Sequence, residues 1–305
     1  MLVPIMVGPT AVGKTAVSIP LAKRLNAEIV SADSRQVYKY MDIGTAKPDP
    51  EEIHEIPHHL VDTLDLEEPY TAGRFAEDGR RCIREIFARG KTPMVVGGAG
   101  LYIKALLEGL FDEPARDEAV RERLYQRIET EGIEPVYKEF CEIDPDYADQ
   151  VHPNDVKKIV RAMEIYQVTG KAPSDQFEPD HAGLEYPYRM VGLTRDRAEL
   201  YDRINRRVEW MISKGLVDEV RTLLEEGYTG EENSLQTVGY REIIRHLHGE
   251  LSLEEAVSDI QKHTRHYAKR QLTWFRNQHD VQWFHMGEYE SREDLVDAIE
   301  EYLHE

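Results

Sequence analysis

The residues best suited to chemistry form a glycine-rich loop near the start of the chain. Its sequence is GPTAVGKT, from Gly8 to Thr15, and it lies between an apolar run at 1–7 and a helical pattern at 16–25. Every fixed position of the phosphate-binding motif G-x-x-x-x-G-K-[ST] is present at the right spacing. Glycines let the backbone turn its N–H groups inward, and a helix beginning at the loop adds the positive end of its dipole. The loop therefore predicts a site for a di- or triphosphate.

Two side chains of this loop have the chemistry to act on the phosphates. Lys14 would reach across the outer phosphates, and the Thr15 hydroxyl would ligate a Mg²⁺ ion that the phosphates share. A glycine-rich turn without a ligand would leave this Lys-Thr pair unexplained. The motif does not identify the ligand that carries the phosphates, because nucleoside triphosphates are only its commonest ligands.

A parallel α/β sheet flanked by helices is expected to position the loop. Strand patterns occur at 1–7, 28–33, 58–62, 93–96, 189–193 and 281–284, and helical patterns at 16–25, 71–89, 101–107, 197–213, 217–226, 240–247, 252–276 and 290–303. Ligands of such sheets bind at the carboxyl ends of the strands. Asp33, which ends the second strand, and the glycine-rich turn at 97–100 should therefore lie beside the phosphate loop.

Several polar residues follow these strands. The carboxylate of Asp33 could act as a base, or it could cap the next helix, and its position alone favours neither role. The polar turn DIGTAKP places Thr45 and Lys47 where they could face a phosphate. The adjacent His58 and His59 would point to opposite sides of a strand, which favours a structural role over a shared metal.

The pattern changes between 112 and 185. Three helical segments, 117–131, 134–142 and 155–169, follow one another without an intervening strand pattern, and the stretch 175–188 resembles a loop. We therefore predict a P-loop core formed by 1–111 and 186–305, with an all-helical insertion at 112–185.

The composition is that of a globular protein, because 41% of the 305 residues are hydrophobic and 31% are charged. A net charge of −20 argues at first sight against a nucleic-acid partner. The charges are segregated, however. Acidic residues crowd 112–149 and the C-terminal tail, whereas 262–276 contains five Lys and Arg residues and no acid. The total charge therefore does not exclude RNA.

Cysteine usage and the N-terminus bear on the cellular compartment. Cys82 and Cys141 are far apart and lack ligand spacing, so neither a disulfide framework nor a zinc site is expected. The apolar N-terminus has no basic leader and enters the phosphate loop directly, so we expect no signal peptide and no transmembrane segment. These features fit a reducing cytoplasm.

Clusters of Lys and Arg lie at 157–161, at 203–207 and in the acid-free stretch 262–276. Each cluster alone is most simply a solvated helix face. Beside a phosphate loop, the three together favour contacts to the backbone phosphates of a polyanion. Trp274 and Phe275 could stack on a base, but adjacent bulky residues in a helix are more often part of the core.

Six motifs in order resemble the tRNA dimethylallyltransferase family, also called the tRNA isopentenyltransferases. They are GPTAVGKT, SADSRQVYK (31–39), DIGTAKP (42–48), VVGGAGLYIKALL (95–107), HPNDVKKIVRAMEI (152–165) and TRHYAKRQLTWFR (264–276), and they span nearly the whole chain. The resemblance implies a P-loop kinase-like core with an inserted helical domain that grips the anticodon stem-loop of tRNA. That architecture agrees with the insertion inferred from the pattern.

The resemblance also implies a reaction. A dimethylallyl group passes from dimethylallyl diphosphate to the exocyclic amine of the adenosine immediately 3′ of the anticodon, and diphosphate leaves. The phosphate loop, Lys14 and a Mg²⁺ ion on Thr15 would stabilise the leaving charge. Asp33 matches the family's aspartate that takes the amine proton, which favours its catalytic role. The adenosine must leave its stack to meet the donor. We expect a cytoplasmic monomer with no membrane contact.

Further residues are assigned through the same resemblance. Diphosphate contacts are expected at Gly8, Thr10, Ala11, Val12, Gly13, Lys14, Thr15 and Gly98. tRNA contacts are expected at Asp33, Ser34, Arg35, Gln36, Ala99, Arg121, Lys157, Lys158, Ile159, Val160, Arg161, Arg265 and Arg270. Either Arg203 or Arg207 should face the diphosphate, and both are retained as catalytic candidates. Ala99 departs from the family, which commonly has a threonine there that helps to hold the diphosphate and the adenosine.

Three other functions share parts of this pattern. A small-molecule kinase would have the same loop, fold and Mg²⁺, but it would consume ATP. An enzyme that prenylates free adenine nucleotides would not need the helical insertion. A tRNA-binding module without chemistry would not need the carboxylate of Asp33.

Overall fold

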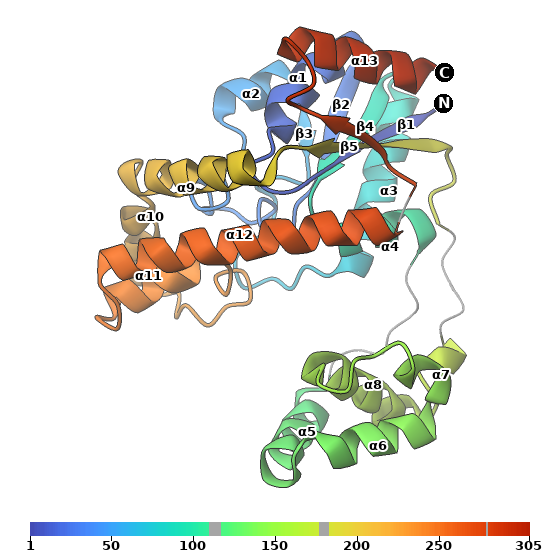
Figure 1. Cartoon of the computed structure of the whole chain (residues 1–305), viewed down its shortest axis with the longest axis vertical. Coiled ribbons are helices and arrows are strands. Elements are labelled where there is room, and N and C mark those ends of the chain that lie inside the picture. The colour runs from blue at the N-terminus through green and yellow to red at the C-terminus, as the bar shows by residue number, and fades with distance from the viewer. Residues whose placement is uncertain (110–116, 177–182, 279) are drawn as a thin grey trace. The chain divides into compact units, whose positions relative to one another are not determined.

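The protein consists of two units. The computed structural model describes residues 1–109, 117–176, 183–278 and 280–305. The core unit comprises Met1–Leu107 and Leu184–Glu305, and the insertion unit comprises Glu108–Gly183 (Figure 1). These bounds lie a few residues from the predicted limits of the insertion, 112 and 185. Asp112 itself lies outside the described residues, as does the part of the predicted loop at 177–182.

Six strands form one parallel sheet in the core unit, which confirms the predicted fold class. They are β1 (Val3–Val7), β2 (Ala27–Ala32), β3 (His58–His59), β4 (Thr92–Gly97), β5 (Tyr188–Thr194) and β6 (Gln282–His285), in the order β3-β2-β4-β1-β5-β6. Val7 at the end of β1 is level with Gly97 of β4, and Gly97 is level with Ala32 of β2. Both glycine-rich turns and Asp33 therefore leave the sheet at one edge.

The third strand is shorter than the predicted 58–62. β3 contains only His58 and His59. Leu60 and Asp62 both adopt positive φ angles, 62° and 57°, which end the extended conformation. The two histidines have separate partners, since His58 Nδ1 lies 2.7 Å from the carbonyl oxygen of Ile56 and His59 Nε2 lies 2.7 Å from Glu28 Oε2.

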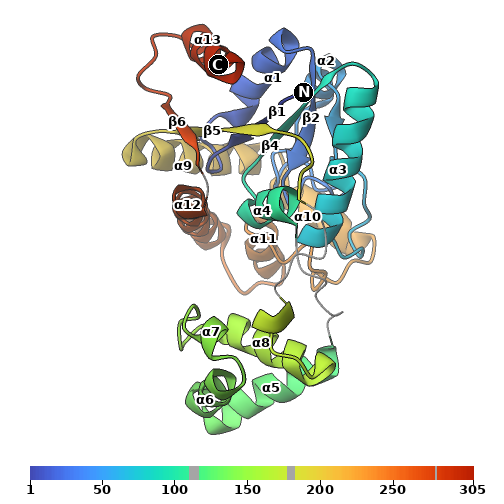
Figure 2. The ribbon, with the colours of Figure 1, turned by 90° about the vertical axis from the view of Figure 1, so that its right-hand side faces the viewer.

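Helices cover both faces of the sheet (Figures 1 and 2). They are α1 (Lys14–Arg24), α2 (Pro50–Glu55), α3 (Ala72–Ala88), α4 (Gly100–Glu108), α9 (Arg197–Ser213), α10 (Leu216–Glu225), α11 (Tyr240–Leu247), α12 (Leu253–Gln278) and α13 (Arg292–His304). α1 and α13 pack together on one face, and α3 covers the other (Figure 2). α9 and α11 have the predicted bounds. Within the described residues, none of the helices combines the length and the apolar character needed to cross a bilayer.

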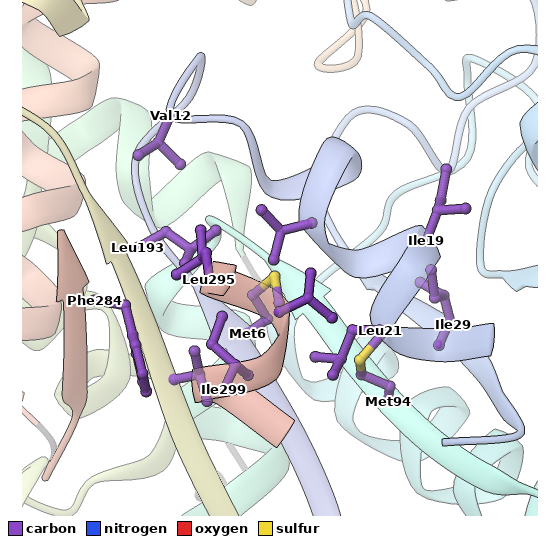
Figure 3. Packing of buried hydrophobic residues seen from close by; sticks show 14 of the residues in the cluster. Met6, Val12, Ile19, Leu21, Ile29, Met94, Leu193, Phe284, Leu295 and Ile299 are labelled. Atoms are coloured by element: carbon purple, nitrogen blue, oxygen red, sulfur yellow. The ribbon is translucent and has the colours of Figure 1, made fainter. Parts of the chain in front are cut away.

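The apolar core between the sheet and α1 and α13 also anchors the phosphate loop. Met6, Met94 and Leu193 of the strands pack with Leu295 of α13, and Val12 of the loop belongs to the same cluster (Figure 3). Val12 is fully buried. Because burying such a side chain contributes about 1.5–3 kcal/mol, Val12 fixes the middle of the loop to the core.

The insertion unit is helical, as predicted. It contains α5 (Glu118–Glu131), α6 (Ile133–Ile143), α7 (Pro145–Ala148), α8 (Val156–Thr169) and a short 3₁₀ helix at Ser174–Gln176. Asp117 caps α5 by accepting from Val120 N at 2.9 Å, and Asp155 caps α8 by accepting from Lys158 N at 3.2 Å. Val136, Phe140 and Met163 are fully buried between these helices and give the unit its own core.

Candidate active site

The phosphate loop joins β1 to α1 and depends on its two glycines. A Cβ atom at Gly8 would lie 2.8 Å from the carbonyl oxygen of Leu193, so no side chain fits there. Gly13 adopts a φ of 114° immediately before α1, a conformation that strongly favours glycine. The first N–H groups of α1 therefore open onto the loop, as an anion site requires.

Lys14 folds back over this loop. Its ammonium group donates to the carbonyl oxygens of Gly8 and Pro9 at 2.9 and 3.0 Å. Burial lowers the pKa of Lys14 to about 8, with Asp33 raising it and Arg207 lowering it further. An anion in the loop would restore the charged form, because opposite charges stabilise each other when water is excluded.

A cavity of about 920 Å³ opens at this edge of the sheet, and predicted site residues border it together. Its lining includes Thr10, Ala11, Gly13, Lys14, Thr15, Asp33, Gln36, Arg203 and Arg207. Asp33 follows β2 directly, and its Oδ1 atom accepts from the backbone N–H groups of Arg35 at 2.9 Å and Gln36 at 3.4 Å. Asp33 thus caps a turn rather than a helix, because no helix begins in the described stretch between β2 and α2 at Pro50, and it also borders the cavity.

Both arginine candidates of α9 contact the phosphate loop. Arg203 Nε donates to the carbonyl oxygen of Ala11 at 2.9 Å. Arg207 Nη1 lies 3.5 Å from the Thr10 hydroxyl, and its Nη2 lies 3.4 Å from the carbonyl oxygen of Thr45. Burial lowers the pKa of both guanidinium groups, although an arginine remains charged at neutral pH. The choice between them was open in the sequence, and the structure places both on the cavity wall.

Gln271 of α12 joins the two glycine-rich turns. Its Oε1 atom accepts from Thr10 N at 2.9 Å, and its Nε2 donates to the carbonyl oxygen of Gly98 at 2.9 Å. Arg195 holds the same loop from another side, donating from Nε to the carbonyl oxygen of Val12 at 2.8 Å. Neither role could be predicted from the sequence, because each residue lies more than 180 positions from the loop residue that it binds.

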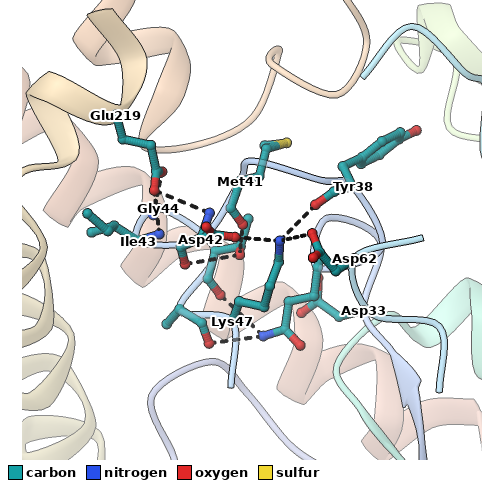
Figure 4. A network of polar contacts seen from close by, with 12 residues as sticks. Asp33, Tyr38, Met41, Asp42, Ile43, Gly44, Lys47, Asp62 and Glu219 are labelled. Carbon is teal, nitrogen blue, oxygen red and sulfur yellow. Dashed lines mark hydrogen bonds and ion pairs between the residues drawn. The ribbon is translucent and has the colours of Figure 1, made fainter. Parts of the chain in front are cut away.

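The DIGTAKP turn, whose Thr45 borders the cavity, is fixed by a polar network (Figure 4). The carboxylate of Glu219 accepts from the N–H groups of residues 42–44, at 3.3, 2.7 and 3.2 Å, and from the Tyr240 hydroxyl at 2.5 Å. Lys47, predicted as a phosphate contact, instead lies 2.5 Å from Asp42 and 2.9 Å from Asp62. The prediction for Lys47 is wrong because two carboxylates neutralise its charge.

A second cavity of about 200 Å³ adjoins the first. It is lined by polar residues, including Ser34, Arg35 and Thr264, and by the apolar side chains of Ile204, Val208, Met211 and Ile260. Five residues border both cavities: Thr10, Asp33, Thr45, Arg207 and Tyr267. Two ligands could therefore approach each other at this junction, one along the phosphate loop and one past Ser34 and Arg35.

Comparison with known proteins assigns the family. Residues 36–278 match the family model described as IPP transferase. This chain belongs to the IPP transferase family. Relatives of this chain include the tRNA dimethylallyltransferase of Bacillus cytotoxicus, 47% identical over 297 residues, which cover 97% of this chain and 94% of the relative. The tRNA dimethylallyltransferase 1 of Syntrophotalea carbinolica is 46% identical over 298 residues, covering 97% and 95%.

Two solved structures resemble this chain over almost its whole length. The full-length tRNA isopentenylpyrophosphate transferase from Bacillus halodurans is 40% identical, with a TM-score of 0.73 and coverage of 99% of this chain and 97% of the other. A eukaryotic dimethylallyltransferase acting on tRNA is 28% identical, with a TM-score of 0.78 and coverage of 99% and 79%. The family expected from the sequence motifs is thereby confirmed.

The core-unit residues that were predicted to contact tRNA differ in their surroundings. The Arg35 guanidinium donates to the carbonyl oxygen of Asn233 at 2.7 Å, and Gln36 donates to those of Thr45 and Ala46. Arg265 Nη1 donates to Asn205 Oδ1 at 2.6 Å, which holds it against α9. Arg270 is exposed on α12, where a polyanion could reach its guanidinium group.

In the insertion unit, two of the predicted arginines share one buried carboxylate. Glu164 is fully buried and accepts from Arg121 Nε at 2.9 Å and from Arg161 Nη1 at 2.8 Å. Burial alone would raise the pKa of Glu164, but the hydrogen bonds from Arg161 and Arg121 outweigh it, so the pKa is lowered. The role of Glu164 could not be predicted from the sequence, because an isolated acid in a basic helix gives no sign of its partners.

Four neighbouring residues of α8 were also predicted to contact tRNA. Lys157 and Lys158 are exposed on the first turn, where a polyanion could reach them. Ile159 and Val160 are 0% and 1% exposed, and both belong to the core of the insertion unit. The prediction that the side chains of Ile159 and Val160 contact tRNA is therefore wrong. The helical period turns both side chains into the core, where they support the helix that carries the two lysines.

Ala99, the departure from the family pattern, lies at the start of α4. Its N–H donates to the carbonyl oxygen of Ala32 at 3.2 Å, and its own carbonyl accepts from Tyr102 and Ile103. We expect Ala99→Thr to leave turnover unchanged or to raise it, because a threonine would add a hydroxyl without removing these backbone bonds. Steady-state prenylation of tRNA by the variant and the parent checks this, with Ala99→Val as the control of similar shape. A tenfold loss specific to threonine would show that the turn is aligned wrongly with the family.

Proposed function

We propose that this enzyme transfers a dimethylallyl group from dimethylallyl diphosphate to the exocyclic amine of the adenosine 3′-adjacent to the anticodon of tRNA. The products are N⁶-(dimethylallyl)adenosine in tRNA and diphosphate. Family membership supports prenylation of tRNA. The observation that carries the choice of donor and acceptor is the junction of the two cavities, where phosphate-loop residues and Asp33 border the same space.

The phosphate loop would bind the diphosphate and stabilise it as it leaves. Cleavage of the bond between the allylic carbon and oxygen adds negative charge to the diphosphate. The loop N–H groups, Lys14 and Arg207 would face that charge, and such preorganised donors typically contribute 10²- to 10³-fold each. Arg203 would act mainly by holding the loop, since its Nε already donates to Ala11.

The acceptor is a poor nucleophile that needs help. The lone pair of an adenine amine is delocalised into the ring, so the amine must lose a proton as it forms the new bond. Asp33 borders both cavities and would take that proton. Ser34 and Arg35 border the second cavity, so we assign that cavity to the extruded adenosine.

The donor set also fits a Mg²⁺ ion. Thr15 is exposed on the wall of the larger cavity at the start of α1, and its hydroxyl is the ligand that a phosphate-loop site offers. When bound, Mg²⁺ would neutralise part of the charge on the diphosphate. The remaining ligands would come from the diphosphate and from water, as is usual for this ion.

The insertion unit would supply the grip on the anticodon stem-loop through Lys157, Lys158, Arg121 and Arg161. Arg265 and Arg270 of α12 would add contacts from the core. We propose that the enzyme works as a monomer in the cytoplasm, a reducing compartment that is compatible with its free Cys82 and Cys141.

Mass spectrometry of anticodon-loop nucleosides tests the proposed function. The full-length enzyme is incubated with unmodified tRNA, Mg²⁺ and dimethylallyl diphosphate, and the nucleosides are then analysed. We expect one dimethylallyl group on the adenosine next to the anticodon. A reaction that consumes ATP and leaves tRNA unchanged would instead indicate a kinase. Modification of free AMP in preference to tRNA would indicate an adenine-nucleotide prenyltransferase.

The affinity for tRNA should fall steeply with salt, despite the net charge of −20. Each phosphate neutralised by Lys or Arg releases condensed counterions, with a slope of about −0.7 to −0.9 per contact in log K against log salt. Fluorescence anisotropy between 50 and 300 mM KCl measures the slope. The double variant Lys157→Ala/Lys158→Ala should have a shallower slope, by the amount expected for about two phosphate contacts. The control Lys138→Ala on α6 should leave the slope unchanged. An unchanged slope in the double variant would contradict the role of the α8 lysines.

A further inference from the structure

Among the five residues that border both cavities, Tyr267 has no role in the mechanism so far. Thr10 and Arg207 belong to the diphosphate site, Asp33 takes the proton, and Thr45 offers its carbonyl oxygen to Arg207. Within the described residues, Tyr267 is the one aromatic side chain found in both linings. The donor carbon and the acceptor nitrogen must meet at this junction, so the ring lies where the reacting atoms come together.

One face of α12 presents Tyr267 to the junction. Ile260, Thr264, Tyr267 and Gln271 follow one another at spacings of four, three and four residues, which places them on one side of the helix, and all four border one or both cavities. Gln271 fixes this face to both glycine-rich turns. The ring itself is held partly by Arg270, whose guanidinium carbon lies 5.8 Å from the ring centroid.

The phenol is poorly suited to exchange a proton at neutral pH. Burial raises the pKa of Tyr267 above its ordinary value, and the nearby carboxylate of Asp33 raises it further. Tyr267 therefore brings a neutral aromatic ring to the junction. The faces of such a ring carry partial negative charge and attract cations, more strongly where water is excluded.

Displacement at an allylic carbon needs a stabiliser of positive charge. The amine lone pair forms the nitrogen–carbon bond while the carbon–oxygen bond breaks, and that bonding pair leaves with the diphosphate. The amine proton passes to Asp33. When bond breaking runs ahead of bond formation, positive charge develops on the allyl group. Other than Tyr267, the residues at the junction are Asp33, to which the amine proton passes, Arg207, which faces the diphosphate, and two threonines.

We propose that Tyr267 is a catalytic residue whose aromatic ring stabilises the allyl cation through a cation–π interaction. This inference rests on the proposed function and adds a role that the diphosphate site and the base do not fill. The proposal assigns different roles to the ring and to the hydroxyl group of Tyr267. The ring should govern the chemical step, whereas the hydroxyl should be dispensable.

Graded substitution of Tyr267 tests the proposal. Tyr267→Phe keeps the ring, and Tyr267→Leu keeps an apolar side chain without one. Single-turnover prenylation at saturating tRNA and donor should show Tyr267→Phe within about threefold of the parent, and Tyr267→Leu slower by about 10- to 100-fold. The Kd for tRNA and the Tm of both variants should stay close to those of the parent.

A fluorinated series supplies a readout that packing alone would not move. Phenylalanine with one, two or three ring fluorines is incorporated at position 267, which weakens the negative face of the ring in steps with little change in shape. We expect the single-turnover rate to fall at each step. A flat series, or a Phe variant as slow as the Leu variant, would overturn the proposal. If the parent itself forms no prenylated tRNA, the proposed function fails instead, so the two failures are distinguishable.

Discussion

Asp33→Asn should abolish most of the prenyl transfer while leaving tRNA binding intact. We expect the single-turnover rate to fall by about 100- to 10,000-fold, the range typical for loss of a general base. Asparagine keeps the oxygen that accepts from the N–H groups of Arg35 and Gln36, so the turn after β2 should survive. The amide cannot take a proton from the adenosine amine, so only the chemical step should suffer.

Rapid-quench measurement of prenylated tRNA and an equilibrium measurement of tRNA affinity check this result together. Asp49→Asn provides a matched control, because Asp49 caps α2 through the same kind of bond, to Glu52 N at 2.9 Å, and asparagine caps equally well. The control should keep the parent rate. If Asp33→Asn retained more than a tenth of the activity, Asp33 would not be the base. Loss of tRNA affinity in the same variant would point to a role in binding instead.

The parts of the site that sequence predicted correctly are those encoded by neighbouring residues. The phosphate loop is specified by eight consecutive residues, and both of its required glycines are in the motif. Asp33 could be placed beside the loop because parallel strands share a carboxyl edge. The helical period gave the bounds of α9, and with them the alignment of Arg203 and Arg207 on one face.

The parts that sequence could not predict depend on partners far along the chain. Gln271 binds Thr10 across 261 positions, and Glu219 binds the N–H group of Ile43 across 176. A glutamine or a glutamate on a helix does not reveal which distant backbone group it will meet. Lys47 was misassigned for the same reason, because a lysine's charge fits a phosphate as well as the two aspartates that it meets in the fold.

Deprotonation of Lys14 should lower kcat/KM at alkaline pH, and replacing Lys14 should remove this pH dependence. Its pKa is lowered from 10.5 to about 8, so the charged form that stabilises the diphosphate dominates below pH 8 and is lost as the pH rises through that value. The kcat/KM for dimethylallyl diphosphate, which reports the free enzyme, should therefore fall above about pH 8. The kcat should fall less over the same range, because bound diphosphate holds Lys14 in its charged form.

Lys14→Met should lower kcat/KM by about 10²- to 10³-fold and remove this descending limb, since the variant has no ammonium group to lose. Lys14→Arg is the matched control, because its guanidinium stays charged across the range and should keep the profile level to pH 10. Deprotonation of Lys14 does not itself destabilise the fold. The folded state binds fewer protons at Lys14 than the unfolded state between pH 8 and 10.5, so this group's contribution to the free energy of unfolding rises with pH there. A descending limb that persisted unchanged in Lys14→Arg would assign the ionisation to another group and would deny Lys14 its role on the diphosphate.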